Sequence, residues 1–337
     1  TLPVQTLLQP RDYINSHQLV IVMALLLLGI FVARPEMVAP ATQFSFSEAA
    51  AVPMWLPFLF ITVACGACSG FHCLVSSGCS SKQLQHETDA RSVGYGAMLL
   101  EGMLAVLVIL ACTAGIGLGF KGLTGAEAFQ TNYQTWGGNL GLITKLSPFV
   151  EGGSNMIRTL PFINEAFGEA VLGVFIASFA ATTLDTATRL QRYVISELAG
   201  SINLNWATGR YVATGIAAGS GLVLAVYDIF HATTFAEGLR IGGKGGMTLW
   251  PLFGATNQLL AGLALLVATV WLYRKQKPVV ITAIPMVFML LMTGWALVLQ
   301  ISAFAAGPDE TRNPILFGIG ALILLLEVWI DRKSTRL

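Results

Sequence analysis

The chain has 337 residues, of which 55% are hydrophobic and only 11% are charged, and its formal net charge is +1. Soluble domains typically carry about 25% charged residues, so this composition excludes an ordinary soluble globular protein. A net charge so close to zero gives no indication of nucleic-acid binding. The mean hydropathy of +0.70 instead predicts an integral membrane protein.

The apolar residues come in blocks of about twenty, which is the length a helix needs to cross the hydrocarbon core of a bilayer. The sequence therefore predicts an all-α membrane protein with about eight spanning helices. Their expected ranges are 18–33, 53–78, 92–118, 166–190, 211–229, 247–273, 279–305 and 314–330. The segment 119–165 is too polar to span, and unstructured loops of its length are uncommon, so we expect a folded external cap built of short helices.

The short loops predict the orientation of the chain, because cytoplasmic loops carry an excess of Lys and Arg. One side of the predicted membrane collects most of these residues: Arg11, Lys82, Arg91, Arg189, Arg192, Arg210, Arg274, Lys275 and Lys277. We expect this side to be cytoplasmic. The cap at 119–165 then lies outside, and the first helix runs outward.

The second predicted helix does not read as a continuous helix. Within Trp55–Lys82, the stretch CGACSG at residues 65–70 is made of small residues and is interrupted by Gly66 and Gly70. Each glycine costs about 1 kcal/mol relative to alanine in a helix interior. A break at membrane depth frees backbone groups that lipid cannot satisfy, so it must border protein or a water-filled cavity. Transporters use such broken helices to bind substrates or ions. The alternatives are a re-entrant loop or a small-residue packing face.

Seven residues at this break, or on a helix expected to face it, are the candidate substrate-binding residues. They are Cys65, Gly66, Ser69, Gly70, Phe71, His72 and Asn257. His72 either carries a proton or meets a substrate, or it is a structural histidine. Asn257 lies in the polar stretch GATNQ of an otherwise apolar helix, where it either faces a cavity or joins helices by hydrogen bonds.

Four residues are candidates for ion or proton coupling. Charged residues inside membrane helices are costly, which makes Glu101 a candidate to carry a proton, unless it only bonds a neighbouring helix. We expect it to be buried among apolar residues, where a carboxylate takes up a proton more readily than in water. Thr182 and Thr183 offer hard hydroxyl ligands for a small cation, or they satisfy carbonyls of their own helix. Asp185 either joins them or pairs with Arg189 one turn away.

The cysteines do not predict a metal site. Four of them form the pattern Cys65-x2-Cys68-x4-Cys73-x5-Cys79, but they lie in apolar helix, where small thiols pack well, rather than on accessible loops. The sequence also contains no phosphate-binding loop, zinc-hydrolase motif or nucleophilic serine elbow. We therefore expect no metal, no cofactor and no enzymatic activity.

Four blocks of the chain resemble the carbon starvation protein A family of inner-membrane transporters. They are PFLFITVACGACSGFHCLVSSGCSSKQL from residue 57, ETDARSVGYGAMLLEGMLAVLVILAC from residue 87, SFAATTLDTATRLQRYVISEL from residue 178 and LWPLFGATNQLLAGLAL from residue 249. The first block is specific to that family. The chain departs from it at Cys68, Cys73 and Cys79, where the family usually has Ala or Thr, and this further weakens a metal site.

The resemblance implies a secondary active transporter that takes up pyruvate or peptides during carbon starvation. Proton coupling is the usual proposal for the family, with sodium as the alternative at Thr182 and Thr183. Both substrates carry a carboxylate, which suits a half-helix N-terminus and bare amides between Gly66 and Gly70. The expected partners are thus a carboxylate or peptide, a proton and membrane lipid, and the expected location is the inner membrane.

The family in turn resembles the amino acid-polyamine-organocation superfamily, which is built on two inverted five-helix repeats. By that resemblance, the range 1–330 is a partial transmembrane transporter domain that forms the second half of the fold, and the first four core helices are missing. The last seven residues, 331–337, are expected to be a non-native tail, because DNA resembling a sequencing adapter would encode DRKSTRL.

Two other functions compete with transport. A membrane sensor or receptor that keeps the transporter fold would need a signalling domain. A channel would need a continuous polar pore, whereas the polar groups of this sequence concentrate at breaks near the middle of the membrane. That concentration favours a transporter.

Overall fold

The computed structural model describes residues 4–41, 55–133, 142–161, 163–231, 244–306 and 313–334. Among these residues, six helices are long and apolar enough to cross a membrane: Gln9–Ala33, Trp55–Lys82, Asp89–Leu118, Ala166–Ser201, Leu252–Arg274 and Val280–Ala306. Arg210–Val226 and Pro314–Leu326 are shorter apolar helices. The prediction of an all-α integral membrane protein is confirmed.

The chain divides into two compact units, each with its own apolar core. One unit combines Thr1–Val52 with Leu84–Ala218, and the other combines Pro53–Gln83 with Gly219–Leu337. The segment that contains the predicted helix break therefore belongs to the same unit as the last third of the chain.

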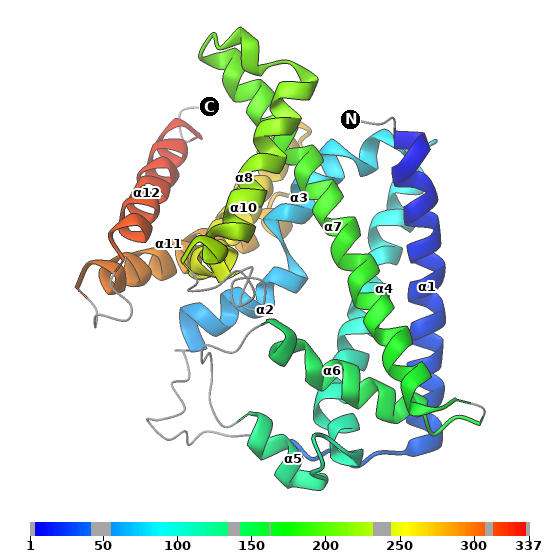
Figure 1. The fold of residues 1–337 in the computed structure, drawn as a ribbon. Helices are drawn as coiled ribbons and strands as arrows, with labels where there is room; N and C mark the ends of the chain where they lie inside the picture. Colours follow the sequence, from blue (N-terminus) through cyan, green and yellow to red (C-terminus); the bar gives the residue numbers. More distant parts are fainter. Residues whose placement is uncertain are drawn as a thin grey trace. The chain divides into compact units, whose positions relative to one another are not determined.

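Four helices form the core of the first unit (Figure 1). They are α1 (Val4–Ala33), α4 (Asp89–Thr113), α6 (Leu142–Ile157) and α7 (Glu165–Ser201). Shorter helices are η4 (Gly115–Leu118), α5 (Gly125–Asn132) and η5 (Asn205–Ala207), and α8 (Arg210–His231) begins in this unit. Leu26, Leu107, Met156 and Leu172, one from each core helix, are almost completely buried.

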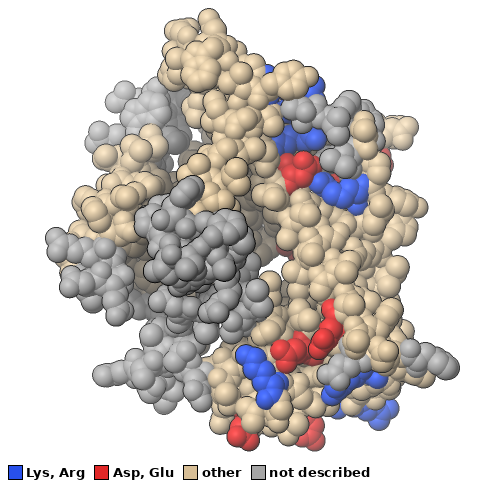
Figure 2. All heavy atoms as spheres, in the orientation of Figure 1, with Lys and Arg blue, Asp and Glu red and all other residues tan. Residues whose placement is uncertain are grey.

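The charged side chains of this unit gather toward its ends on the face drawn in Figure 2. Blue and red side chains form an upper and a lower group in the region of α1, α6 and α7, and tan surface separates the two groups. An uncharged belt between charged ends is what a spanning unit needs, because lipid does not solvate charges.

The segment 119–165 contains short helices, as predicted, but one of them, α6, also contributes to the apolar core of the unit. Its residues Phe149, Met156 and Ile157 belong to the apolar core of the unit. Gly152 lies so close to α4 that a Cβ atom there would meet the carbonyl oxygen of Ala111. The buried side chain of Asn155 donates to the carbonyl oxygen of Gly115 at 3.1 Å, where α4 has ended. The small residue Gly152 and the polar residue Asn155 thus allow α6 to pack closely on α4 and on the segment that follows it.

Two helices of the first unit are longer than predicted. Helix α1 begins at Val4 rather than near residue 18, and α7 continues to Ser201 rather than ending near residue 190. The 37 residues of α7 make a helix about 55 Å long, well beyond the ~30 Å of a bilayer core. The predicted ends were wrong because hydropathy locates the part of a helix that lies in lipid, not the residue where the helix ends. In α7, no helix-breaking residue follows residue 190 until Gly200.

The second unit is organised around α10 (Lys244–Arg274). This helix packs against α2 (Phe60–Ala67), α3 (Gly70–Gly78), α11 (Val280–Ala306) and α12 (Pro314–Ser334). The short helices η2 (Trp55–Leu59) and η3 (Ser80–Lys82) flank α2 and α3. Ile61, Leu252 and Leu297 lie in the core of the unit, so α2, α10 and α11 share one apolar centre.

Candidate functional site

The predicted helix break is present between α2 and α3. Cys68 has φ −151° and ψ 84°, and Ser69 has φ −93° and ψ 136°, so both residues leave the helical conformation. Figure 1 draws α2 and α3 as two separate helical segments. The two glycines lie on either side of these residues, at Gly66 and Gly70, rather than in the extended part itself.

Asn257 of α10 caps the first turn of α3. Its Oδ1 accepts from the backbone N–H of Phe71 at 2.9 Å and from the hydroxyl of Ser69 at 3.1 Å. Its Nδ2 donates to Ser69 Oγ at 2.9 Å and to Cys65 Sγ at 3.3 Å. Ser69 is the N-cap residue of α3, but its own side chain makes no capping bond. A side chain from another helix therefore satisfies an amide that the break frees.

Gln258, the second polar residue of the stretch GATNQ expected to face a cavity or to join helices, supports the other side of the break, although it was not among the candidate substrate-binding residues. It is fully buried. In the amide orientation that satisfies both ends of the side chain, its nitrogen donates to the carbonyl oxygen of Cys68 at 2.7 Å, and its oxygen accepts from the backbone N–H of Cys65 at 2.8 Å. Adjacent residues of α10 thus hold the end of α2 and the start of α3. The sequence signal for Gln258 was its place beside Asn257 in an apolar helix.

The helices α3 and α10 approach each other closely at Gly70. A Cβ atom at this position would meet the carbonyl oxygen of Asn257, and it would lie 2.6 Å from Leu260 Cβ and 2.9 Å from the backbone nitrogen of Ala261. Gly70 therefore faces protein rather than an open cavity. The glycine at this position allows the two backbones to touch.

Five of the seven predicted substrate-binding residues lie together where α2 and α3 contact α10, and the other two do not take part in these contacts. Cys65, Ser69, Phe71 and Asn257 are linked by the hydrogen bonds of Asn257, and Gly70 packs on the same helix. Gly66 and His72 are exposed, and a Cβ atom at Gly66 would meet nothing within 4 Å. Among the described residues, no group of three His, Cys, Asp or Glu side chains is arranged to hold a metal ion.

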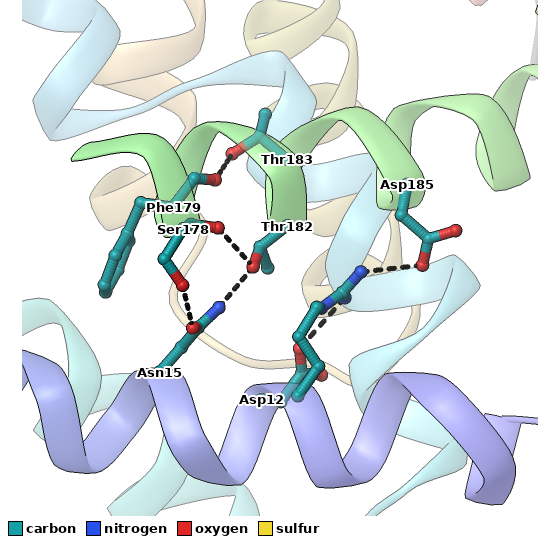
Figure 3. A network of polar contacts seen from close by, with 8 residues as sticks. Asp12, Asn15, Ser178, Phe179, Thr182, Thr183 and Asp185 are labelled. Atoms are coloured by element: carbon teal, nitrogen blue, oxygen red, sulfur yellow. Dashed lines mark hydrogen bonds and ion pairs between the residues drawn. The ribbon is translucent and has the colours of Figure 1, made fainter. Parts of the chain in front are cut away.

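A polar network joins α1 to α7 in the first unit (Figure 3). Asn15 of α1 is buried, with 5% of its surface exposed. Its amide donates to Thr182 Oγ1 and accepts from the hydroxyl of Ser178. Thr182 in turn donates to the carbonyl oxygen of Ser178 at 2.9 Å. Sequence reasoning missed Asn15 because it precedes the range in which the first helix was expected to begin.

Asp185 pairs with Arg11 of α1 and not with Arg189, so the predicted partner was wrong. Arg11 Nη1 lies 2.8 Å from Asp185 Oδ2, and Nη2 lies 3.0 Å from Asp12 Oδ1. The predicted pairing with Arg189 assumed that Asp185 would bind the nearest cation along its own helix. Instead, the packing of α1 on α7 brings together residues 174 positions apart.

The ion pair between Arg11 and Asp185 predicts a measurable coupling energy. We expect Asp185→Asn to lower the free energy of unfolding by about 1–2 kcal/mol, because Arg11 is only 19% exposed and would lose its partner. A double-mutant cycle with Arg11→Gln, measured by thermal unfolding in detergent, should give a clear interaction energy. The matched cycle of Asp185→Asn with Arg189→Gln should give none. Equal coupling in the two cycles would contradict this assignment.

The paired threonines have different surroundings. Thr182 faces α1 and contacts Asn15, whereas Thr183 is exposed and donates to the carbonyl oxygen of Phe179 at 3.0 Å (Figure 3). Both hydroxyls therefore satisfy carbonyls of their own helix, which was the alternative to ion binding. Each oxygen keeps a free lone pair, so the contacts do not exclude a cation.

Glu101 is exposed in the structure, which corrects the expected burial among apolar residues. It lies twelve residues after Asp89, the first residue of α4, and is therefore about 18 Å into the span. That position lies well inside the span Asp89–Leu118. The neighbouring side chains of Met98 and Leu100 are also exposed. A carboxylate at this depth requires protein or water beside it.

The family follows from comparison with known proteins. The sequence profile of the family described as Carbon starvation protein CstA matches residues 1–135 and 124–296 of the chain. This chain belongs to the CstA family. The match covers both α2 to α3, with the break, and the part of α10 that carries Asn257. No solved structure matches the sequence of this CstA-family chain.

Curated relatives of this CstA-family chain include transporters with two kinds of substrate in their names. The pyruvate/proton symporter BtsT of Escherichia coli K12 is 32% identical over 91% of this chain and 49% of its own length. The peptide transporter CstA of Helicobacter pylori 26695 is 35% identical over 89% and 48%, and that of Campylobacter jejuni is 32% identical over 91% and 48%. The chain thus spans about half the length of these relatives.

Proposed function

We propose that this protein is a secondary active transporter of the inner membrane that takes up small carboxylates such as pyruvate, or peptides, together with protons. The observation that carries the proposal is the break at Cys68 and Ser69, in a helix that is long and apolar enough to span. A half-helix that starts inside the membrane directs its N-terminal amides and positive dipole end at a substrate, and carboxylates suit that end.

The capping of α3 narrows where a substrate carboxylate would bind. Asn257 already occupies the amide of Phe71, so the amides available in the first turn are those of Gly70 and His72, which have no acceptor among the described residues. Because Gly70 is pressed against α10, the open side of this turn is that of His72, which is exposed. We infer that the substrate meets α3 from the side of His72.

Uptake by the protein expressed from its full gene and reconstituted in liposomes tests the proposal. Labelled pyruvate and labelled dipeptides are offered with and without an inward proton gradient. Saturable accumulation that requires the gradient supports a proton-coupled transporter and identifies the substrate. Ligand binding without any uptake would favour the sensor instead, and uptake that does not saturate would favour a channel.

Glu101 is the acid we propose for proton coupling, since it lies inside a span and, unlike Asp185 with Arg11, forms no ion pair with another described residue. We expect Glu101→Gln to abolish gradient-driven accumulation while substrate exchange between the two sides of the membrane continues, because a glutamine cannot release a proton. Glu87→Gln, the same change in the polar segment before α4, should leave accumulation unchanged.

Two results would remove Glu101 from this role. The first is normal gradient-driven accumulation by Glu101→Gln. The second is uptake by the wild type that follows a sodium gradient and ignores pH, which would favour ion binding at Thr182 and Thr183.

A further inference from the structure

An open groove of about 610 Å³ lies where α10 meets α11. It is lined by Trp271, Leu272, Lys275, Lys277, Pro278 and Ile281. Trp271 is 58% exposed and Ile281 is 79% exposed, so the described protein leaves the apolar wall uncovered. One span ends at Arg274 and the next begins at Val280. The groove therefore lies where spanning helices meet the headgroup region of a bilayer.

Backbone hydrogen bonds hold the turn that carries the two lysines. The N–H of Lys277 donates to the carbonyl oxygen of Leu272 at 2.9 Å, and that of Gln276 donates to Tyr273 at 3.0 Å. Gln276 has φ 54°, so a residue in the left-handed conformation reverses the chain at the end of α10. The backbone of Lys275 and Lys277 is thereby held at the mouth of the groove.

The turn carries a concentrated positive charge. Arg274, Lys275 and Lys277 lie within four residues, and neither α10 nor α11 contains Asp or Glu. None of the ion pairs formed by the described residues involves these three side chains. The partial charges at the end of α10 and the start of α11 are opposite in sign, so the charge of the turn comes from its side chains. Lys275 Nζ lies 5.9 Å from the ring centre of Trp271, directly beside the apolar wall.

We propose that this groove binds an anionic phospholipid, with its phosphate at Lys275 and Lys277 and an acyl chain along Trp271 and Ile281. The lysines at the mouth of the groove and its exposed apolar wall suit a ligand that has both a negative charge and an apolar chain. A free hydrated anion has no apolar surface to bury against the wall and is not stabilised by it. Clustered cations at a membrane surface favour anionic over zwitterionic lipids. Tyr273, 70% exposed, adds a second aromatic residue of the kind found at headgroup level.

Native mass spectrometry of the purified protein tests this inference independently of transport. With dioleoyl phosphatidylglycerol and dioleoyl phosphatidylcholine at equal concentrations in detergent, the wild type should retain phosphatidylglycerol preferentially. The double variant Lys275→Gln with Lys277→Gln should retain phosphatidylglycerol about 30-fold more weakly. This factor assigns to each lysine the stabilisation that one cation of a basic segment gains at an anionic membrane surface. Lys121→Gln, which removes a lysine of the other unit, should keep the wild-type preference. Added salt should weaken the preference of the wild type, because exposed charges are screened.

Several outcomes would overturn the proposal. Equal retention of both lipids by the wild type, a preference that ignores salt, or an unchanged preference in the double variant would each do so. Displacement of phosphatidylglycerol by millimolar inorganic phosphate would identify a site for a free anion. An equal loss in Lys121→Gln would show that the lipid responds to the charge of the whole protein. The salt dependence of the wild type decides the matter if the double variant does not fold.

Discussion

Replacement of Asn257 by alanine is expected to abolish uptake and to lower the free energy of unfolding by about 3 kcal/mol. The side chain is 7% exposed, and its Oδ1 accepts from the amide of Phe71 and the hydroxyl of Ser69. Alanine would leave the part-buried amide of Phe71 and the hydroxyl of buried Ser69 without their partner. Without its cap, the first turn of α3 should fray, and the substrate would lose the end of the half-helix.

Hydrogen exchange separates this explanation from a general loss of folding. In Asn257→Ala, the amides of residues 69–73 should exchange faster than in the wild type, while those in the middle of α10 should stay protected. Thr256→Ala is the matched control, because this neighbouring hydroxyl bonds the carbonyl oxygen of Leu252 in its own helix. Normal uptake with unchanged exchange in Asn257→Ala would show that α3 does not depend on this cap.

The break was predictable from the sequence because its cause is local. Glycines and small polar residues inside an apolar run weaken a helix wherever they occur, and the interruption at Cys68 and Ser69 lies between Gly66 and Gly70. The residue that caps α3 was harder to predict from the sequence. Asn257 was among the predicted residues because a polar side chain in a membrane helix requires a partner, but nothing in the sequence shows that it faces Phe71, 186 residues away. For the same reason, nothing in the sequence shows that its neighbour Gln258 bonds the backbone of Cys65 and Cys68.

The first unit shows where sequence reasoning fails. Arg189 is one helical turn from Asp185, yet the partner is Arg11, because a helix surface offers neighbours at fixed spacing whereas packing chooses among distant ones. Glu101 shows a related limit. Its depth in α4 follows from sequence position and helix rise, but its burial depends on what packs against that face.

A leucine in place of Gly70 is expected to abolish uptake while leaving membrane insertion intact. Insertion depends on the hydropathy of the span, which leucine raises. Function fails because the side chain has no room: even its Cβ atom would meet the carbonyl oxygen of Asn257 and lie 2.6 Å from Leu260 Cβ. The bulk would separate α3 from α10 and pull Phe71 away from its cap.

A series of substitutions tests this mechanism. Gly70→Ala should already lower stability by about 1–3 kcal/mol, as overpacked sites do, and should reduce uptake. Gly318→Leu is the matched control, because Gly318 lies in α12 of the same unit and a Cβ atom there would meet nothing within 4 Å. That variant should insert, fold and transport like the wild type. If Gly70→Ala were as stable and active as the wild type, the close contact between α3 and α10 would not be what holds the broken helix in place.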